Sequence, residues 1–338
     1  MKYKDAFNLA KQNNIDGERT RILMKYILKD EFNKYSVDTE LKKEQENFLK
    51  NSIEELKNGK PIQYITHEQY FYGNKFYVDE NVLIPQPDTE IIVEETLKQI
   101  KNLKKQNVKI LDLCTGTGAI AISILNYFDK NISDNSSKLN VSDFNKYTDD
   151  FTLEANVSNF NKHIDDFTLE SNAKLFNKNK SKTYSKLKEI KENNLLPNKK
   201  NIEMYASDIS KNALKVAYKN EENILKKHVI KFVQSDMFEN IKEKFDIIVS
   251  NPPYIKSDVI KTLQKDVQNE PHIALDGGKD GLKFYKIISD NYKKYLEKDG
   301  IILLEIGFDQ RNDVQTLFKG STCIKDFAGN DRVIIYKE

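Results

Sequence analysis

The sequence has no tryptophan, only two cysteines and no hydrophobic run that approaches the roughly 20 apolar residues of a membrane span. Cys114 and Cys323 stand far apart and without the spacing of metal ligands, which excludes a disulfide framework and a zinc site and indicates a reducing compartment. The first residues, Met1 to Asp5, are not followed by the apolar segment of a signal peptide. We therefore expect a cytoplasmic protein that does not engage a membrane.

An excess of charge of one sign is also absent. The chain carries 54 Lys and Arg residues against 52 Asp and Glu residues, a net charge of +2. No field over the whole surface attracts nucleic acid, so we expect no direct nucleic-acid partner, although a local basic face is left open. The length of 338 residues allows one large or two modest domains.

The segments before residue 85 differ in their periodicity. Residues 1–66 place apolar side chains at helical spacing between charges, up to a stop at Gly59-Lys60-Pro61, and predict a small N-terminal helical domain. Residues 67–84 carry aromatic residues on both sides of Gly73-Asn74-Lys75. This pattern predicts a β-hairpin that links two domains.

Residues 85–338 alternate strands with helices. The prolines within 85–87 predict an extended approach, and Asp88 or Thr89 is expected to cap a helix at 91–100. The strands are expected at 108–113, 202–208, 230–233, 245–249, 300–305, 324–327 and 333–336. This alternation predicts an α/β fold with a mostly parallel seven-stranded sheet, helices on both faces and an antiparallel edge.

An insertion at about residues 130–199 interrupts this alternation. It contains a tandem repeat, because residues 140–155 and 156–171 agree at twelve of sixteen positions. Its first part is acidic, its second part is basic, and its apolar spacing is weak. We interpret it as a largely disordered insertion, with a docking arm for a partner as the alternative.

A glycine-containing turn, Asp112 to Gly118, follows the strand at 108–113. Glycines there let the backbone approach a ligand, although such turns also serve as plain strand–helix joints. A nucleoside site requires an acid about 20 residues further on, to bind the ribose. Asp208 stands 92 residues beyond Gly116 (208 − 116), and subtraction of the insertion of about 70 residues leaves about 22.

The third strand leads to a second acid, Asp236, beside Met237. We expect Asp236 to accept the exocyclic amine of an adenine while Met237 packs on the ring; a solvated acid and a core methionine are the alternative. Because the glycine turn lacks the lysine of triphosphate sites, a sulfonium nucleoside such as S-adenosylmethionine fits better. The predicted cofactor-binding residues are Asp112, Cys114, Thr115, Gly116, Thr117, Gly118, Asp208, Asp236, Met237 and Asn251.

The fourth strand is followed by Asn251-Pro252-Pro253-Tyr254, at the carboxyl end of a central strand, where open α/β sheets bind ligands. Asn251 offers an amide oxygen, Pro252 a fixed carbonyl and Tyr254 a flat ring. Two fixed acceptors hold both N–H bonds of an amide-like nitrogen and aim its lone pair at a methyl donor. The motif predicts methyl transfer to a planar nitrogen, with Asn251, Pro252 and Tyr254 catalytic and Pro253 in the substrate site. A rigid turn without function is the alternative.

These residues resemble the release factor glutamine N5-methyltransferase family over most of the chain outside the insertion. The shared stretches are 61–64, 84–90, 112–118, 206–208, 251–254, 270–278 and 326–333. Asn-Pro-Pro-Tyr alone is also found in methyltransferases of adenine and cytosine amino groups, whereas the stretches at 84–90 and 270–278 are more specific.

The resemblance implies a class I, Rossmann-like methyltransferase domain at 85–338, a hairpin linker at 67–84 and an N-terminal domain at 1–66 that docks the substrate. It implies S-adenosylmethionine as cofactor, and the glutamine in the Gly-Gly-Gln motif of peptide chain release factors as substrate. Asn251 and Pro252 would hold the side-chain amide of that glutamine. We expect a monomer.

Three features depart from the family. Cys114 replaces the usual first glycine of the turn, Gln86 replaces an arginine, and the insertion is atypical. Three alternative functions stay open: a glutamine methyltransferase of a ribosomal protein, an N6-adenine methyltransferase of DNA or rRNA, and a non-catalytic binder of a translation factor. Base extrusion would require a basic groove that the charge balance does not supply, and the intact motif at 251–254 argues against a non-catalytic binder.

Overall fold

The computed structural model describes residues 1–29, 39–133 and 200–338. The predicted insertion and its repeat therefore lie outside the described residues, apart from residues 130–133. The chain divides into two compact units, one of residues 1–127 and 201–338 and one of residues 128–200. The first unit contains the sheet and the candidate site. No helix among the described residues is long and apolar enough to span a membrane.

Four helices open the chain, and their apolar side chains form a core of their own. They are α1 (Tyr3–Gln12), α2 (Gly17–Leu28), α3 (Lys43–Lys57) and α4 (Ile62–Thr66). Leu23, Leu49 and Ile53 are among its most buried members. The predicted stop is confirmed: α3 ends two residues before Gly59, and Pro61 precedes the first turn of α4. The assignment of residues 1–66 as a domain stays a prediction.

A β-hairpin follows, formed by β1 (Glu68–Phe71) and β2 (Asn74–Tyr77). The predicted turn at 73–75 is wrong by one residue, because Asn74 and Lys75 pair in the hairpin. The turn is Tyr72-Gly73, with φ of +49° and +69°. Two positive φ values in succession make the tight turn that suits the twist of a hairpin.

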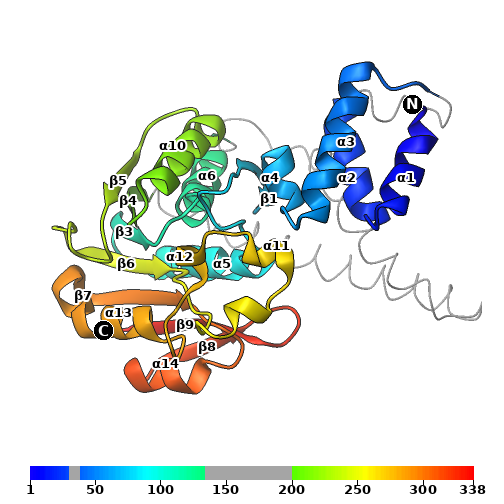
Figure 1. Cartoon of the computed structure of the whole chain (residues 1–338). Helices are drawn as coiled ribbons and strands as arrows, with labels where there is room; N and C mark the ends of the chain where they lie inside the picture. The colour runs from blue at the N-terminus through cyan, green and yellow to red at the C-terminus, as the bar shows by residue number, and fades with distance from the viewer. Residues whose placement is uncertain (30–38, 134–199) are drawn as a thin grey trace, which may run out of the picture. The chain divides into compact units, whose positions relative to one another are not determined.

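The main sheet has seven strands in the order β5-β4-β3-β6-β7-β9-β8 (Figure 1). The strands are β3 (Asn107–Leu113), β4 (Asn201–Asp208), β5 (Ile230–Gln234), β6 (Phe245–Ser250), β7 (Leu296–Glu305), β8 (Thr322–Lys325) and β9 (Asp331–Lys337). The first five are parallel, and β9 is antiparallel to both of its neighbours. The predicted mostly parallel sheet with an antiparallel edge is confirmed. The carboxyl ends of β3, β4, β5 and β6 therefore share one edge, where the loops that follow them meet.

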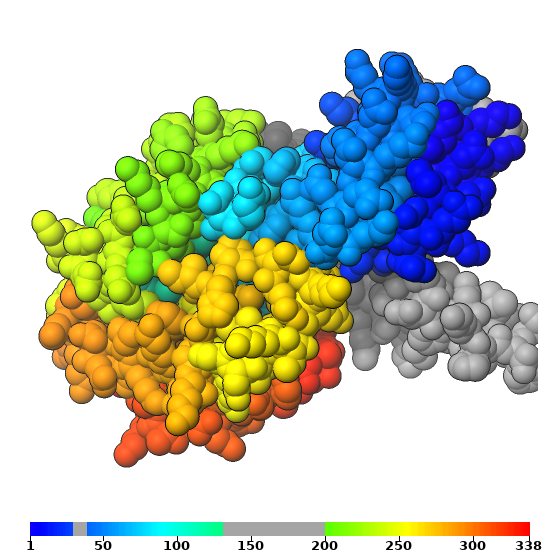
Figure 2. Space-filling view, in the orientation of Figure 1, coloured from blue at the N-terminus to red at the C-terminus, as the bar shows by residue number. Residues whose placement is uncertain are grey.

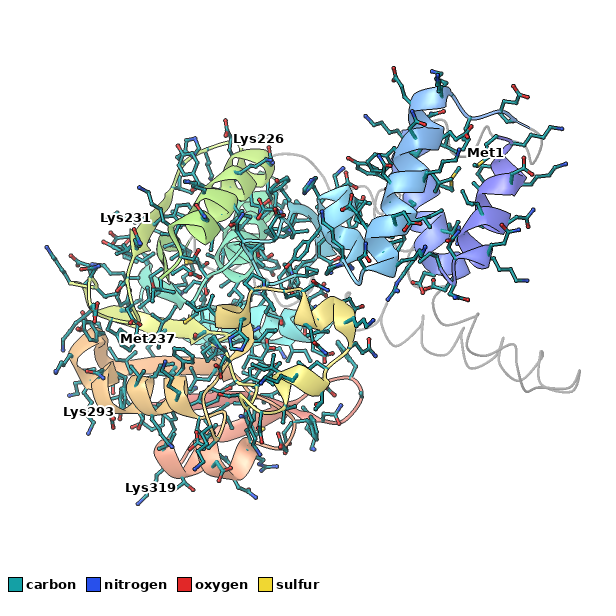
Figure 3. The ribbon with its side chains drawn as sticks, viewed as in Figure 1. Met1, Lys226, Lys231, Met237, Lys293 and Lys319 are labelled. Carbon is teal, nitrogen blue, oxygen red and sulfur yellow. The ribbon has the colours of Figure 1, made fainter. Side chains whose placement is uncertain are left out.

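Helices flank this sheet. The α-helices are α5 (Glu90–Asn102), α6 (Ala119–Ser133), α10 (Lys211–Leu225), α11 (Lys265–Gln268), α12 (His272–Leu275), α13 (Lys283–Tyr295) and α14 (Arg311–Leu317), with 3-10 turns η2 (Pro87–Thr89) and η3 (Ile260–Thr262). Helices α13 and α14 bury Tyr285, Ile288 and Val314 against Ile248 and Ile302 of the sheet. In Figure 3 the labelled lysines lie at the surface, whereas Met237 lies inside.

Two local predictions are wrong. Thr89 occupies the N-cap position of α5, but neither its side chain nor that of Asp88 forms a capping hydrogen bond. Their side chains bond instead to Arg332 and Asn251, which belong to distant segments. The strand predicted at 324–327 ends at Lys325. Asp326 accepts the backbone N–H of Asn330 at 2.8 Å and so closes the turn between β8 and β9.

Candidate functional site

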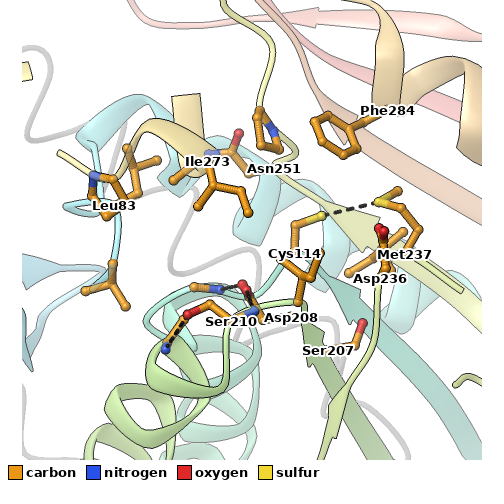
Figure 4. A pocket seen from close by; sticks show the side chains of 18 of the residues that line it. Leu83, Cys114, Ser207, Asp208, Ser210, Asp236, Met237, Asn251, Ile273 and Phe284 are labelled. Atoms are coloured by element: carbon orange, nitrogen blue, oxygen red, sulfur yellow. Dashed lines mark hydrogen bonds between the residues drawn. The ribbon is translucent and has the colours of Figure 1, made fainter. Parts of the chain in front are cut away.

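A cavity lies at the carboxyl ends of β3, β4, β5 and β6 (Figure 4). Of the predicted site residues, those that line it are Cys114, Gly116, Asp208, Asp236, Met237, Asn251 and Pro253. Those that do not line it are Asp112, Thr115, Thr117, Gly118, Pro252 and Tyr254. The structure thus brings the glycine turn, the two strand-end acids and Asn251 around one space.

The glycine turn owes its shape to a buried acid behind it. Asp112 is fully buried and accepts the hydroxyl of Thr115 at 2.6 Å and the N–H of Ala121 at 3.2 Å. Burial, the dominant cause, raises the pKa of Asp112 to about 7. Asp112 therefore organises the turn from behind, and its assignment as a cofactor-binding residue stays a prediction.

Gly118 is required where the turn enters α6. It has a φ of +79°, and a Cβ at this position would lie 2.8 Å from Ile122 Cδ1 and 3.3 Å from Ala217 Cβ. Only glycine tolerates both this φ and this close approach of two helices. Gly118 therefore shapes the turn by close packing, without facing the cavity.

Asp208 joins β4 to the glycine turn. One carboxylate oxygen accepts the N–H of Gly116 at 2.9 Å, and the other accepts the N–H of Ser210 at 2.9 Å. Burial raises its pKa, and the backbone hydrogen bonds oppose that rise. A carboxylate has about four lone-pair sites, so Asp208 keeps acceptor capacity toward the cavity while it holds the turn.

Two further groups in the cavity wall are open to a ligand. The Ser207 hydroxyl is fully buried and has no hydrogen-bond partner within the described part of the chain. Asp236 is exposed at the end of β5 and next to the buried Met237. Buried polar groups are nearly always bonded, so the unpaired Ser207 hydroxyl is a candidate partner for a polar group in the cavity.

Cys114 adopts a conformation that favours glycine. Its φ is +64°, and its Sγ lies 3.8 Å from the Sδ of Met237 in the cavity wall (Figure 4). A side chain in this left-handed region is strained, which accounts for the usual glycine of the family. Because of this strain, replacement of Cys114 by the usual glycine should have a measurable effect.

We expect Cys114→Gly to tighten cofactor binding about threefold, because glycine relieves the strain and clears the cavity wall. The free energy of unfolding should change by less than about 1 kcal/mol, since the relief of strain is offset by the greater freedom of glycine in the unfolded chain. Isothermal titration calorimetry and thermal melting measure the two quantities. Cys323→Ala, on β8, is the control, and weaker binding by the Cys114 variant would contradict the interpretation.

The loop after β6 places Asn251 at the cavity. The Ser250 hydroxyl donates to the carbonyl of Leu113 at 2.6 Å, which ties β6 to the glycine turn. Pro252 is buried, and its carbonyl accepts no hydrogen bond within residues 1–29, 39–133 and 200–338. The loop therefore presents a fixed and unoccupied acceptor next to Asn251.

Tyr254 turns away from the cavity. It packs against the core of the sheet, and Gln310 Nε2 donates to its carbonyl at 3.0 Å. Burial, the largest cause, raises the pKa of the Tyr254 phenol, and the nearby Glu305 adds to the rise. Its predicted stacking on the substrate stays a prediction.

Three side chains near the site bond to segments that are distant in the sequence, and the sequence did not predict these contacts. Glu270 is buried and accepts the N–H of Ile84 at 2.8 Å, which joins the two family-specific segments. Burial raises the pKa of Glu270 to about 7. Figure 2 shows the yellow and orange residues that follow β6 against the cyan segment that contains Ile84. The prolines within 85–87 predicted an extended segment, but they did not predict that Glu270 binds it.

Asn220 is the second such residue. Fully buried on α10, it accepts the N–H of Tyr77 at 2.7 Å and donates to the carbonyls of Tyr77 and Thr117, both at 3.0 Å. It thereby fixes the hairpin to the glycine turn. No sequence signal distinguishes it from a surface asparagine of an amphipathic helix.

The third contact is made by Arg332, which is largely buried. Its guanidinium pairs with Asp326 at 3.1 Å and with Asp88 at 3.0 Å. It thereby joins the segment at 326–333 to the segment at 84–90. Gln86, where the family has arginine, is exposed and donates to the carbonyl of Ile84 at 3.0 Å.

Comparison with known proteins identifies the family. A family described as RMKL-like, methyltransferase domain, matches residues 102–264. The release factor glutamine methyltransferase of Thermodesulfovibrio yellowstonii is 33% identical, over 93% of this chain and 89% of the relative. That of Clostridium acetobutylicum is 32% identical, over 99% and 98%. That of Clostridium botulinum is 36% identical, over 88% and 82%. The chain belongs to the release factor glutamine methyltransferase family.

Membership in this family confirms the predicted resemblance, and this chain is a methyltransferase that uses S-adenosylmethionine. The cavity fits that cofactor in its chemistry: it is lined by two acids, Asp208 and Asp236, by Ser207 with its unpaired hydroxyl, and by the apolar side chain of Met237. A solved methyltransferase from Pyrococcus furiosus is a distant likeness, 14% identical over 79% of this chain and 90% of that one, with a TM-score of 0.42.

Proposed function

We propose that this protein transfers a methyl group from S-adenosylmethionine to the side-chain amide nitrogen of the glutamine in the Gly-Gly-Gln motif of peptide chain release factors. Relatives that carry the name release factor glutamine methyltransferase and align over nearly the whole chain support this substrate. The alignment includes the N-terminal helices, to which we assign the docking of the substrate protein.

The observation that carries the proposal is Asn251 in the cavity wall, directly followed by the unoccupied carbonyl of Pro252, which accepts no hydrogen bond within the described residues. The nitrogen of a primary amide is a poor nucleophile, because its lone pair is delocalised into the carbonyl. Two fixed acceptors that hold its two N–H bonds favour pyramidalisation and aim the lone pair. Bound S-adenosylmethionine supplies an electrophilic methyl group at this place.

The cofactor roles follow from the same cavity. We assign Asp208 to the ribose hydroxyls, Asp236 to the adenine amine and Met237 to the adenine face. Gly116 and Cys114 form the wall next to them. We further propose that the protein acts as a cytoplasmic monomer and does not bind nucleic acid directly.

A competition assay tests the substrate. The protein is incubated with methyl-labelled cofactor and an equimolar mixture of a release factor, ribosomal proteins and duplex DNA. We expect label in the release factor alone, and none when the glutamine of its Gly-Gly-Gln motif is replaced by alanine. Label in adenine or in a ribosomal protein would replace the proposed substrate by one of the alternatives.

A further inference from the structure

A buried polar cluster lies behind Asn251, on the side away from the cavity. The amide of an asparagine has an accepting oxygen and a donating nitrogen of nearly the same shape. If the amide turned over, it would offer N–H groups where the substrate nitrogen needs an acceptor. The chemistry therefore requires that something fixes the orientation of Asn251.

Thr89 contacts the Asn251 amide from behind, and Glu305 is a buried neighbour of both residues. Asn251 Nδ2 donates to Thr89 Oγ1 at 3.2 Å. Thr89 is 4% exposed and Glu305 is 2% exposed, so water does not compete for this bond. Neither residue lines the cavity.

The carboxylate of Glu305 favours this orientation. Burial, the largest cause, raises the pKa of Glu305 to about 7, and its interactions with Thr89 and Asn251 lower it. In its ionised form a carboxylate only accepts hydrogen bonds, so it attracts an amide N–H and repels an amide oxygen. Glu305 therefore favours the orientation in which the nitrogen of Asn251, not its oxygen, lies on this side.

Arg332 supplies a positive charge to this cluster. Its positive charge also lowers the pKa of Glu305, and its guanidinium bonds to Asp88 at 3.0 Å. Without a nearby cation, a carboxylate as buried as Glu305 would take up a proton and could then donate as well as accept. Arg332 thus supports the state in which Glu305 accepts.

We propose that Thr89 is a positioning residue, which holds the amide nitrogen of Asn251 and so turns its oxygen toward the acceptor nitrogen, with the buried Glu305 as a charged neighbour that favours this orientation. This inference rests on the proposed function, because it assumes that Asn251 binds the amide that is methylated. It assigns the family-specific segment at 84–90 a role in orienting the motif at 251–254, through Thr89.

The test compares kinetic constants for methyl transfer to a release factor. Thr89→Val removes the acceptor without a change of volume, and Glu305→Gln replaces a group that only accepts by one that also donates. Each should lower kcat about tenfold, the worth of one typical buried hydrogen bond, while KM and the cofactor Kd stay within about twofold. Thr89→Ser keeps the hydroxyl and should restore kcat to within about threefold of the wild type.

Matched controls exist on the neighbouring helix α5. Thr96 is a fully buried threonine of α5 whose hydroxyl donates to the carbonyl of Ile92, and Glu95 is a buried carboxylate that pairs with Lys98. Thr96→Val and Glu95→Gln should leave kcat unchanged. The inference is wrong if Thr89→Val retains the wild-type kcat, or if Thr89→Ser loses as much activity as Thr89→Val.

A second measurement is independent of the substrate. The side-chain amide signal of Asn251 in a nitrogen–proton correlation spectrum is assigned by its loss in Asn251→Asp, and slow exchange of both protons with water is expected. Thr89→Val should accelerate that exchange, and unchanged exchange would overturn the inference. If the exchange behaves as expected but the wild type methylates no release factor, the proposed substrate fails and the orientation of Asn251 stands.

Discussion

Asn251→Ala is expected to lower kcat on the order of 100- to 1000-fold, the usual effect of removing one preorganised polar group that acts on the reacting atoms. The variant keeps the carbonyl of Pro252 but loses the second acceptor. One N–H of the substrate amide is then no longer held, and the lone pair of the amide nitrogen is no longer directed at the methyl group. The Kd of the cofactor should rise by no more than about threefold, because the acids at Asp208 and Asp236 are untouched. Single-turnover methyl transfer and calorimetry measure the two effects.

Two further variants sharpen this experiment. Asn251→Asp keeps the size of the side chain but places an oxygen, not a nitrogen, against Thr89 and Glu305, so it should also lose most activity. Asn312→Ala, at an exposed position of α14, is the control and should behave as the wild type. Wild-type turnover by Asn251→Ala would refute the role of Asn251.

Asp208→Ala is expected to weaken cofactor binding on the order of 100-fold, because hydrogen bonds to a charged group contribute more than neutral ones. The substitution removes the acceptor for a ribose and also releases the N–H groups of Gly116 and Ser210, to which the carboxylate is bonded. Isothermal titration calorimetry measures the cofactor Kd, and kcat at saturating cofactor should fall much less than the affinity.

A loss of fold must be separated from this effect. Asp208→Asn keeps the volume and one accepting oxygen, so it should melt near the wild-type temperature and lie between the wild type and Asp208→Ala in affinity. Asp313→Ala, at an exposed position of α14, is the control. An unchanged cofactor Kd in Asp208→Ala would remove this residue from the cofactor site.

The sequence predicted the sheet and its ligand-binding edge well, because parallel strands and the turns after them are local patterns. The interval from Gly116 to Asp208, corrected for the insertion, correctly brought two residues of one cavity together although they are 92 residues apart. Asn251 was also placed correctly, since it directly follows a buried central strand. These predictions required only strand order and the position of loops.

Errors arose where side-chain partners come from distant segments. Thr89 matches the pattern of a helix cap, but its hydroxyl accepts from Asn251, 162 residues away. Ile84 and Glu270 are 186 residues apart and meet only in the folded chain. A single sequence records the chemistry of each segment but not which segments pack together, so the cluster behind Asn251 could not be predicted.

The hairpin error has a different cause. Tyr72 has a positive φ, which is uncommon for a bulky residue. Asn74 stabilises the turn by donating to the carbonyl of Tyr72 at 3.0 Å. A pattern that assigns turns to glycine and asparagine therefore shifted the turn by one residue, because it does not anticipate a positive φ at a tyrosine.

The most direct test of the central claim is to locate the transferred methyl group. A release factor is incubated with the protein and S-adenosylmethionine, digested, and analysed by fragmentation mass spectrometry. The proposed function predicts one added methyl group, on the side-chain amide nitrogen of the glutamine in the Gly-Gly-Gln peptide, and none with Asn251→Ala. A methyl group on any other residue, or an unmodified Gly-Gly-Gln peptide under conditions in which the protein methylates another substrate, would contradict it.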